Sequence, residues 1–405
     1  MTPPPRWLSI LGIGEDGVEG MAPAARALLG AAAAVYGGAR HLTLAGGLIG
    51  GTARAWPSPL TDAFPALLAL RPRPVAVLAS GDPYCHGIGA TLAGLVPAEE
   101  RLCLPAPSAF SLACAALGWP LAEVATLSLC GHPLATLIAH LQPGARLLVL
   151  SADATTPGAV AALLRARGFG GSRLHVLEAL GGPRARIRTL RADAPMPAAI
   201  DPLNLLAIEA RAAPDAVVLP QGGGLADDMF EHDGQLTKQE VRAVTLAALA
   251  PRLGEMLWDI GAGSGSIGIE WLLRHPINRA IAIEQHADRA ARAARNAVAL
   301  GVPRLHVVQG TAPAALDGLP PPDAVFIGGG AERPGVIAAA WQALPQGGRL
   351  VVNAVTIETA AALFAACRQH GGTLRRIAVE RLEALGTLHA FRPAMTVTQW
   401  QVRKP

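Results

Sequence analysis

The chain has 405 residues and a formal net charge of +4, and it is 51% hydrophobic but only 16% charged. This composition excludes a disordered chain, which would be poor in apolar residues, and the 45 glycines and 34 prolines exclude a coiled coil. At about 100–200 residues per domain, the length predicts two domains.

The basic residues are almost all arginine, because lysine occurs only at Lys238 and Lys404 among 34 basic positions. Arginine is suited to binding carboxylates and phosphates, but a GC-rich genome also enriches arginine, so both interpretations stay open. The basic residues form no run and aromatic residues make up only 4% of the chain, so we expect no nucleic-acid partner. The five cysteines contain no C-x-x-C pair, and we expect no metal site.

Two stretches of the chain, residues 102–122 and 124–145, contain no Asp, Glu, Lys or Arg. Each is interrupted by proline and glycine, and unwound backbone is costly in lipid, so we expect buried pieces of a core and no membrane span. The opening residues 1–6 lack the apolar core of a signal peptide, which predicts a cytoplasmic protein.

In the first half of the chain, short apolar strands alternate with helical segments, which is typical of an α/β fold with a mostly parallel sheet. The expected strands include residues 7–14, 75–79, 146–150 and 203–208. An irregular segment at 210–215 follows the last of them. It predicts a boundary near residue 212, and hence domains over 1–212 and 213–405.

Glycine-rich turns follow the early strands in a fixed order. Gly12-Ile13-Gly14 comes first, then Ser80-Gly81-Asp82-Pro83, then Pro107-Ser108, and finally Cys130-Gly131-His132. Over roughly residues 7 to 208, this series resembles the tetrapyrrole methylase family. The resemblance implies two α/β subdomains with S-adenosylmethionine in a trough between them. It also implies cofactor contacts from Gly12, Gly14, Gly81, Asp82, Pro83 and Ser108. The sequence departs from the family at Glu15, where proline is usual.

The second half of the chain begins its own series of strands and helices. A helix is expected over 288–300, and the expected strands are residues 256–260, 280–284, 305–309, 324–327 and 349–353. This alternation predicts a second, Rossmann-like α/β domain.

A glycine loop follows the first strand of this second series, over residues 259–268. Gly263-x-Gly265-x-x-Gly268 fits a dinucleotide fingerprint, whereas Gly261-x-Gly263-x-Gly265 after Asp259 fits an S-adenosylmethionine loop. The Asp259 carboxylate can face a cationic cofactor but would repel a pyrophosphate. Glu284, which ends the next strand, suits the ribose hydroxyls of either cofactor. The ordered set resembles class I methyltransferases.

The segment 227–242, upstream of the loop, resembles the entry segment of the decarboxylating methyltransferases of the cobalamin pathway. The resemblance implies that a threonine, the glycine loop, an acidic residue and an alanine bind S-adenosylmethionine. These are Thr237, Gly261, Ala262, Gly263, Ser264, Gly265, Glu284 and Ala312. Thr237 is also expected to cap a helix, with Glu240 completing a capping box.

A tetrapyrrole methylase domain joined to a class I domain resembles the family of decarboxylating precorrin C5,15-methyltransferases. The resemblance implies that precorrin-6Y is methylated at C-5 by the first domain. It implies that the second domain methylates C-15 and decarboxylates the ring C acetate, giving precorrin-8X. Each domain would then hold one S-adenosylmethionine. The alternatives are an NAD-dependent oxidoreductase and a tetrapyrrole-binding protein without activity.

Decarboxylation leaves carbanion character that a positioned acid can protonate. The candidates are His232, Asp227 and Asp228 in the entry segment. The substrate carries several carboxylates, and candidate partners for them are Arg184, Arg186, Arg188 and Arg191, the first three on one strand face. We also expect the chain to form a homo-oligomer.

Overall fold

The computed structural model describes residues 6–405, which form two compact units. The first unit comprises the residues up to 134 together with 142–218, and the second comprises 135–141 together with 219–405. Residues 1–5, on which the signal-peptide prediction partly rests, lie outside the described residues. Within the described part of the chain, every helix is too short or too polar to cross a membrane.

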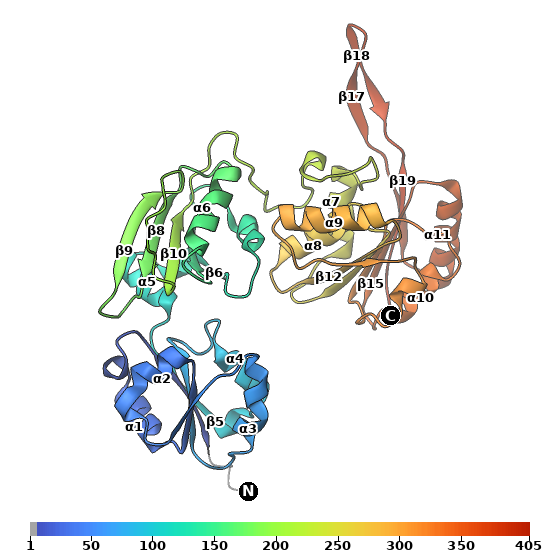
Figure 1. Ribbon diagram of the computed structural model, residues 1–405. Helices are drawn as coiled ribbons and strands as arrows, with labels where there is room; N and C mark the ends of the chain where they lie inside the picture. Colours follow the sequence, from blue (N-terminus) through green and yellow to red (C-terminus); the bar gives the residue numbers. More distant parts are fainter. Residues whose placement is uncertain (1–5) are drawn as a thin grey trace. The chain divides into compact units, whose positions relative to one another are not determined.

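The first unit begins with a parallel five-stranded sheet of order β3-β2-β4-β1-β5 (Figure 1). Buried side chains of α1 and α2 pack on one face, and those of α3 and α4 pack on the other. The strands are β1 (Leu8–Ile13), β2 (Ala34–Gly37), β3 (Thr52–Ala55), β4 (Val75–Ser80) and β5 (Arg101–Leu104). The helices are α1 (Pro23–Ala31), α2 (Ala39–Ala45), α3 (Phe64–Leu68) and α4 (Ile88–Ala93).

A second five-stranded sheet completes the first unit, in the order β6-β7-β10-β8-β9. Only β6 and β7 pair in parallel, and the other neighbours are antiparallel. Its strands are β6 (Val124–Ser128), β7 (Arg146–Leu150), β8 (Arg173–Glu178), β9 (Arg186–Arg191) and β10 (Asn204–Glu209). Its helices are α5 (Ala109–Leu117), which packs against β7 and β10, and α6 (Thr156–Ala166).

The second unit is built on a seven-stranded sheet of order β13-β12-β11-β14-β15-β19-β16. The first five strands are parallel, and the chain reverses direction across the sheet between β11 and β14, where α/β folds bind ligands. The parallel strands are β11 (Met256–Ile260), β12 (Arg279–Glu284), β13 (His306–Gln309), β14 (Ala324–Ile327) and β15 (Arg349–Ala354). The helices are α7 (Gln239–Leu249), α8 (Ser266–Arg274), α9 (Ala287–Ala299), α10 (Val336–Ala343) and α11 (Ile357–His370).

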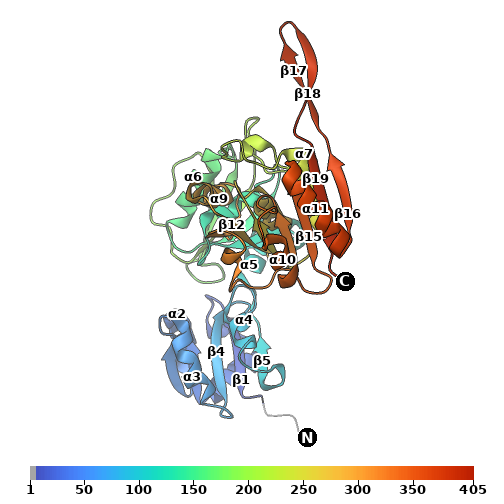
Figure 2. The same ribbon diagram turned by 90° about the vertical axis from the view of Figure 1, so that its right-hand side faces the viewer.

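The last part of the described chain adds features that the sequence analysis did not predict. Strand β19 (Val397–Arg403) is inserted antiparallel between β15 and β16 (Thr373–Ile377), and it buries Trp400 completely. Before it, β17 (Glu380–Leu385) and β18 (Leu388–Pro393) form a hairpin that extends beyond the sheet of this unit (Figure 2).

The predicted fold class is confirmed: both units are α/β, and the expected strands occur at the expected places. Residues 75–80, 146–150, 204–209 and 256–260 are strands, and the helix expected at 288–300 spans 287–299. These segments combine a buried apolar run with a flanking glycine or polar turn, which is a local signal.

Candidate functional site

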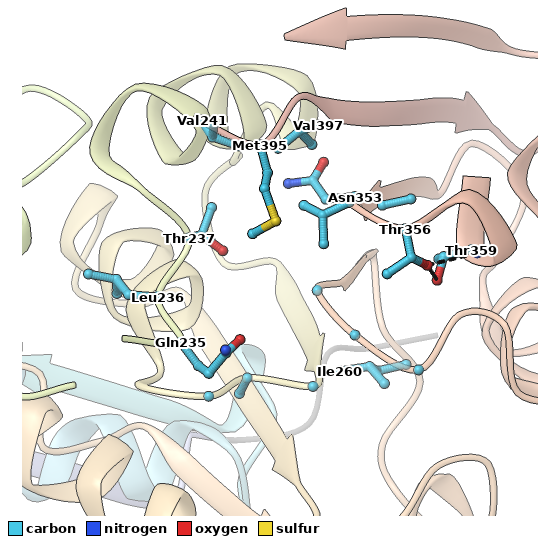
Figure 3. Close-up of a pocket in the computed structure, with 18 of the residues that line it drawn as sticks. Gln235, Leu236, Thr237, Val241, Ile260, Asn353, Thr356, Thr359, Met395 and Val397 are labelled. Atoms are coloured by element: carbon cyan, nitrogen blue, oxygen red, sulfur yellow. Dashed lines mark hydrogen bonds between the residues drawn. The ribbon is translucent and has the colours of Figure 1, made fainter. Parts of the chain in front are cut away.

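The second unit contains a cavity of about 720 Å³ at the carboxyl ends of its parallel strands (Figure 3). This volume lies in the range of small-molecule sites. The cavity is walled by the segment before α7, by the loops after β11, β12, β13 and β14, by the start of α11 and by the base of the hairpin. Thr237 and Gln235 lie on one side of it, Thr356 and Thr359 on the other, and Met395 projects between them.

Three residues of the predicted glycine loop line this cavity: Gly261, Ala262 and Gly263. Gly261 has φ +70°, and a Cβ there would lie 2.8 Å from the Gly329 nitrogen, so only glycine fits between the loop and its neighbour. The Gly263 N–H donates to the Glu284 carboxylate at 2.9 Å. These contacts hold the glycine loop in the wall of the cavity.

The other two loop residues lie behind the cavity wall. Ser264 is buried and does not line the cavity, and Gly265 caps α8 with φ +77°, where a Cβ would meet Ala293 at 3.0 Å. They shape the loop and make no wall of the cavity.

Glu284, Ala312 and Thr237 all line the cavity, as their predicted role requires. The buried Glu284 carboxylate accepts from the backbone N–H groups of Gly263 and His286, each at 2.9 Å, which fixes its orientation. The capping interpretation of Thr237 is wrong. Lys238 is the N-cap of α7 and no side chain caps the helix. The Thr237 side chain is therefore free to face the cavity, as Figure 3 shows.

Asp259 does not face the cavity, and the expectation that it faces a cationic cofactor is wrong. It is buried, and its Oδ2 accepts the Gly268 N–H at 2.9 Å inside the start of α8. Burial raises the pKa of Asp259 to about 7. The residue supports the turn from β11 into α8.

The three candidate acids lie on the entry segment but outside the cavity wall. Asp227 pairs with Arg242 at 3.2 Å, which holds it against the protein. Asp228 and His232 are exposed, and the Nδ1 of His232 accepts the Gly234 N–H at 3.0 Å. The structure does not bring these three groups to the cavity.

In the first unit, the loops after β1, β4 and β5 meet at the carboxyl ends of the strands. A Cβ on Gly12 would lie 2.0 Å from the Gly81 oxygen and 2.3 Å from the Ala106 nitrogen. Gly81 has φ +54°, and a Cβ there would lie 2.6 Å from the Pro107 oxygen. Both glycines are required for this close approach of three loops.

The remaining predicted residues of the first unit lie on the same loops. Asp82 accepts the Tyr84 N–H at 2.8 Å, which forms a turn, and Pro83 is buried under the glycines that follow it. Ser108 caps α5 by accepting the Ser111 N–H at 3.1 Å. Gly14 forms an isolated bridge to Gly17.

The candidate arginines already have carboxylate partners within the first unit. Arg186 and Arg188 both bind the buried Glu178, at 2.8 Å and 2.9 Å. Arg191 pairs with Asp193, and Arg184 pairs with Glu15 and Asp201. Of the four, Arg184 lies nearest the opening loop, because its partner Glu15 belongs to that loop.

The comparisons with known proteins agree with this geometry. A family described as tetrapyrrole (corrin/porphyrin) methylases matches residues 8–194, and one described as a precorrin methyltransferase domain matches 228–404. A relative from Sinorhizobium sp., named precorrin-6Y C(5,15)-methyltransferase [decarboxylating], is 52% identical over 98% of this chain and 96% of that protein. The chain belongs to the precorrin-6Y C(5,15)-methyltransferase family.

Two further members of this family are similar to the chain. One from Mycobacterium tuberculosis is 42% identical over 98% of this chain and 99% of that protein. A crystal structure of the C-terminal domain of precorrin-6Y C5,15-methyltransferase from Rhodobacter capsulatus is 46% identical. It covers 46% of this chain and all of that chain, with a TM-score of 0.44. Family membership confirms the resemblance inferred from the motifs and makes the chain a methyltransferase rather than an oxidoreductase or an inactive binding protein.

The sequence analysis missed one wall of the cavity of this methyltransferase. Glu332 follows the glycines after β14 and accepts from the Thr359 hydroxyl at 3.0 Å. At the hairpin base, Arg381 pairs with Glu240 of α7 at 2.6 Å. The run Gly328-Gly329-Gly330 after a strand was a usable signal for the first of these. Nothing in the local sequence placed the hairpin base at the site.

Proposed function

We propose that this chain is a bifunctional, S-adenosylmethionine-dependent methyltransferase of aerobic cobalamin biosynthesis that acts in the cytoplasm. It methylates precorrin-6Y at C-5 and C-15 and decarboxylates the ring C acetate, giving precorrin-8X. The observation that carries the proposal is the cavity at the strand ends of the second unit, which Gly261, Gly263 and Glu284 line. In the first unit, the loops of Gly12 and Gly81 meet at the corresponding strand ends. The names of the relatives that match almost the whole chain support the same substrate.

Each unit holds its own S-adenosylmethionine in this proposal. The first unit methylates C-5 and binds the cofactor at Gly12, Gly14, Gly81–Pro83 and Ser108. The second unit methylates C-15, decarboxylates, and binds the cofactor at Thr237, Gly261–Gly265, Glu284 and Ala312. Within the second set, Ser264 and Gly265 act through the shape of the loop. The Glu284 carboxylate has its orientation fixed by two backbone N–H groups and accepts from the ribose hydroxyls.

The chemistry in the second unit depends mainly on position. When bound beside Gly261, Gly263 and Glu284, S-adenosylmethionine would supply an electrophilic methyl group for an electron-rich carbon of the reduced tetrapyrrole. The cavity of about 720 Å³ would orient the two reactants against each other. Loss of carbon dioxide leaves carbanion character that the conjugated macrocycle delocalises, and one proton completes the step.

The source of that proton is proposed to be His232, Asp227 or Asp228. These residues precede Gly234–Lys238 in the same segment, and those later residues line the cavity. The matched comparison is Glu332, a carboxyl group already in the cavity wall. One variant combines His232→Ala, Asp227→Asn and Asp228→Asn, and a second carries Glu332→Gln alone. If the first decarboxylates normally and the second does not, Glu332 is the proton donor.

The chain is proposed to assemble into a homo-oligomer through the hairpin of β17 and β18. An isolated two-stranded hairpin is marginally stable in water, yet this one exposes Leu382, Leu385, Leu388 and Phe391, each at 59% or more. A variant that lacks residues 380–393 should be monomeric by light scattering. The core of the first unit around Tyr36 and Trp56 should stay folded. If the deletion leaves the number of chains per particle unchanged, the hairpin does not hold the oligomer together.

Mass spectrometry after incubation with precorrin-6Y and deuterated S-adenosylmethionine tests the central proposal. Two labelled methyl groups and loss of one carbon dioxide are expected. Gly81→Ala should remove transfer by the first unit and Gly261→Ala transfer by the second, because each added methyl group collides with backbone. Binding of NAD without binding of S-adenosylmethionine would refute the function.

A further inference from the structure

A cluster of polar side chains lies at the carboxyl end of β4, the central strand of the first parallel sheet. Ser80, the last residue of β4, is exposed, and its hydroxyl oxygen lies 2.8 Å from the Nε2 of His41. The same oxygen lies 2.8 Å from a guanidinium nitrogen of Arg40. Arg40 in turn pairs with Glu15 of the loop after β1. None of Ser80, His41 and Arg40 was a candidate in the sequence analysis.

The contacts assign the protons in this cluster. A guanidinium only donates, and Arg40 Nη2 lies 3.0 Å from His41 Nε2, so Nε2 is an acceptor. Ser80 therefore accepts from Arg40 and directs its own proton to His41 Nε2. The proton of the neutral ring is then on Nδ1, which is buried and has no hydrogen-bond partner among the described residues.

The surroundings keep His41 neutral. Burial and the charge of Arg40 lower the pKa of His41 to about 4, against the smaller opposing effect of Glu15. A serine hydrolase also pairs serine with histidine, but there a carboxylate accepts from the second ring nitrogen. Because Nδ1 lacks such a partner, this pair is suited to accepting a proton briefly and releasing it, and not to generating a nucleophile.

The position of Ser80 places the pair beside the proposed cofactor loops. Ser80 directly precedes Gly81-Asp82-Pro83, and the Gly12 loop packs against Gly81. Ligands of open α/β sheets bind outside the carboxyl ends of the strands, near the central strands. An exposed hydroxyl at this point can contact a substrate bound next to the cofactor.

We propose that Ser80, with His41 as acceptor and Arg40 as orienting group, takes the proton that the tetrapyrrole loses when it is methylated in the first unit. The inference rests on the proposed C-5 methylation. An electron pair of the meso carbon forms the bond to the methyl group as the sulfur–methyl bond breaks, which leaves S-adenosylhomocysteine and a cationic ring system. The C–H bond of the methylated carbon then breaks, and its electron pair restores the conjugation.

The released proton passes to the Ser80 oxygen while the Ser80 proton passes to His41 Nε2. His41 then carries protons on both nitrogens and returns one to water. In this relay Ser80 is a catalytic residue that touches the substrate, and Arg40 is a positioning residue. Each step conserves charge, because the positive charge of the sulfonium ends as a proton in solvent.

The test uses the full chain with Gly261→Ala, so that methyl transfer reports the first unit alone. Ser80→Ala and His41→Gln should lower kcat for this transfer roughly 10²–10⁴-fold and leave both KM values within about threefold. Thr43→Ala is the matched control, since Thr43 is exposed on the same helix as His41 and its hydroxyl donates to the Ala39 carbonyl within that helix. If the kcat of Ser80→Ala lies within threefold of the kcat of Thr43→Ala, the proposal is overturned.

A pH profile separates the relay from a structural role. The neutral form of His41 is the active one, so kcat should stay flat between pH 8 and 5 in the parent. Arg40→Gln removes a charge that lowers the pKa of His41, so its kcat should fall toward pH 5. A flat profile in Arg40→Gln would also overturn the proposal. Absence of first-unit transfer in the parent, with S-adenosylmethionine still bound, would instead refute the proposed C-5 methylation.

Discussion

Arg242 is a side chain whose removal should strongly destabilise the second unit. It is fully buried in α7 and donates to the equally buried Glu270 at 2.5 Å. It also donates to Asp227 and to the Thr237 carbonyl, and it stacks 4.7 Å from the centre of the Phe230 ring. These contacts attach the entry segment to α7 and α8.

Arg242→Met keeps much of the side-chain volume but leaves the Glu270 charge buried without its partner. Such a change destabilises a protein by about 3–5 kcal/mol. In a unit of this size, 1 kcal/mol corresponds to about 2–4 °C in Tm, so the second unit should melt roughly 10 °C earlier. S-adenosylmethionine should also bind the second unit more weakly, because the segment that carries Thr237 loses its attachment.

Differential scanning calorimetry and equilibrium dialysis measure the two effects. Arg295→Met is the matched control, because Arg295 pairs with Glu231 on the surface of the same unit, with both side chains more than half exposed. Its loss should cost less than about 1 kcal/mol. If Arg242→Met melts within 2 °C of Arg295→Met, the buried pair does not hold the entry segment and the reasoning is wrong.

Three further predictions concern buried groups. Burial opposes ionisation of Glu178, but hydrogen bonds from Arg186 and Arg188 outweigh it and lower its pKa to about 2. The free energy of unfolding of the parent should therefore exceed that of Glu178→Gln by about 1–3 kcal/mol above pH 5. Urea titrations should show this difference disappearing as the pH falls from 4.5 through 2. Asp259 holds a proton in the folded state that the unfolded chain releases, so parent stability should decline as pH rises from 3.8 through 7. Asp259→Asn should flatten that decline, and an unchanged slope would exclude this carboxyl as its source. Trp400→Ala should cost about 3–5 kcal/mol by denaturant unfolding, since its side chain is fully buried; a cost below 1 kcal/mol would contradict the interior position of β19.

Local signals carried much of the fold and part of the site. Strands such as β4 and β11 are buried apolar runs, and glycines follow them where the backbone must turn with positive φ, as at Gly81 and Gly261. A short sequence window contains both features. The glycine turns of both units, where we propose that the cofactor binds, could therefore be predicted without knowledge of the rest of the fold.

Features that depend on distant partners were not predictable in this way. Arg186 and Arg188 meet Glu178 only because β8 and β9 pair in one register, and the pattern of residue types does not give that register. The direction of Asp259 depends on which face of β11 carries α8. The N-cap of α7 is Lys238 and not the predicted Thr237. The Thr237 carbonyl accepts a hydrogen bond from the Arg242 guanidinium, five residues further along the chain.

The inserted position of β19 bears on how the chain folds during synthesis. Residues 397–403 form β19, which pairs with β15 on one side and with β16 on the other. Both strands therefore lack this partner until residues 397–403 have left the ribosome. The first unit needs no residue beyond 218 and can form earlier. Until β19 arrives, the β15 and β16 edges expose unpaired backbone that favours aggregation. A chain truncated before residue 397 would thus carry a complete first unit attached to an incomplete, aggregation-prone second unit.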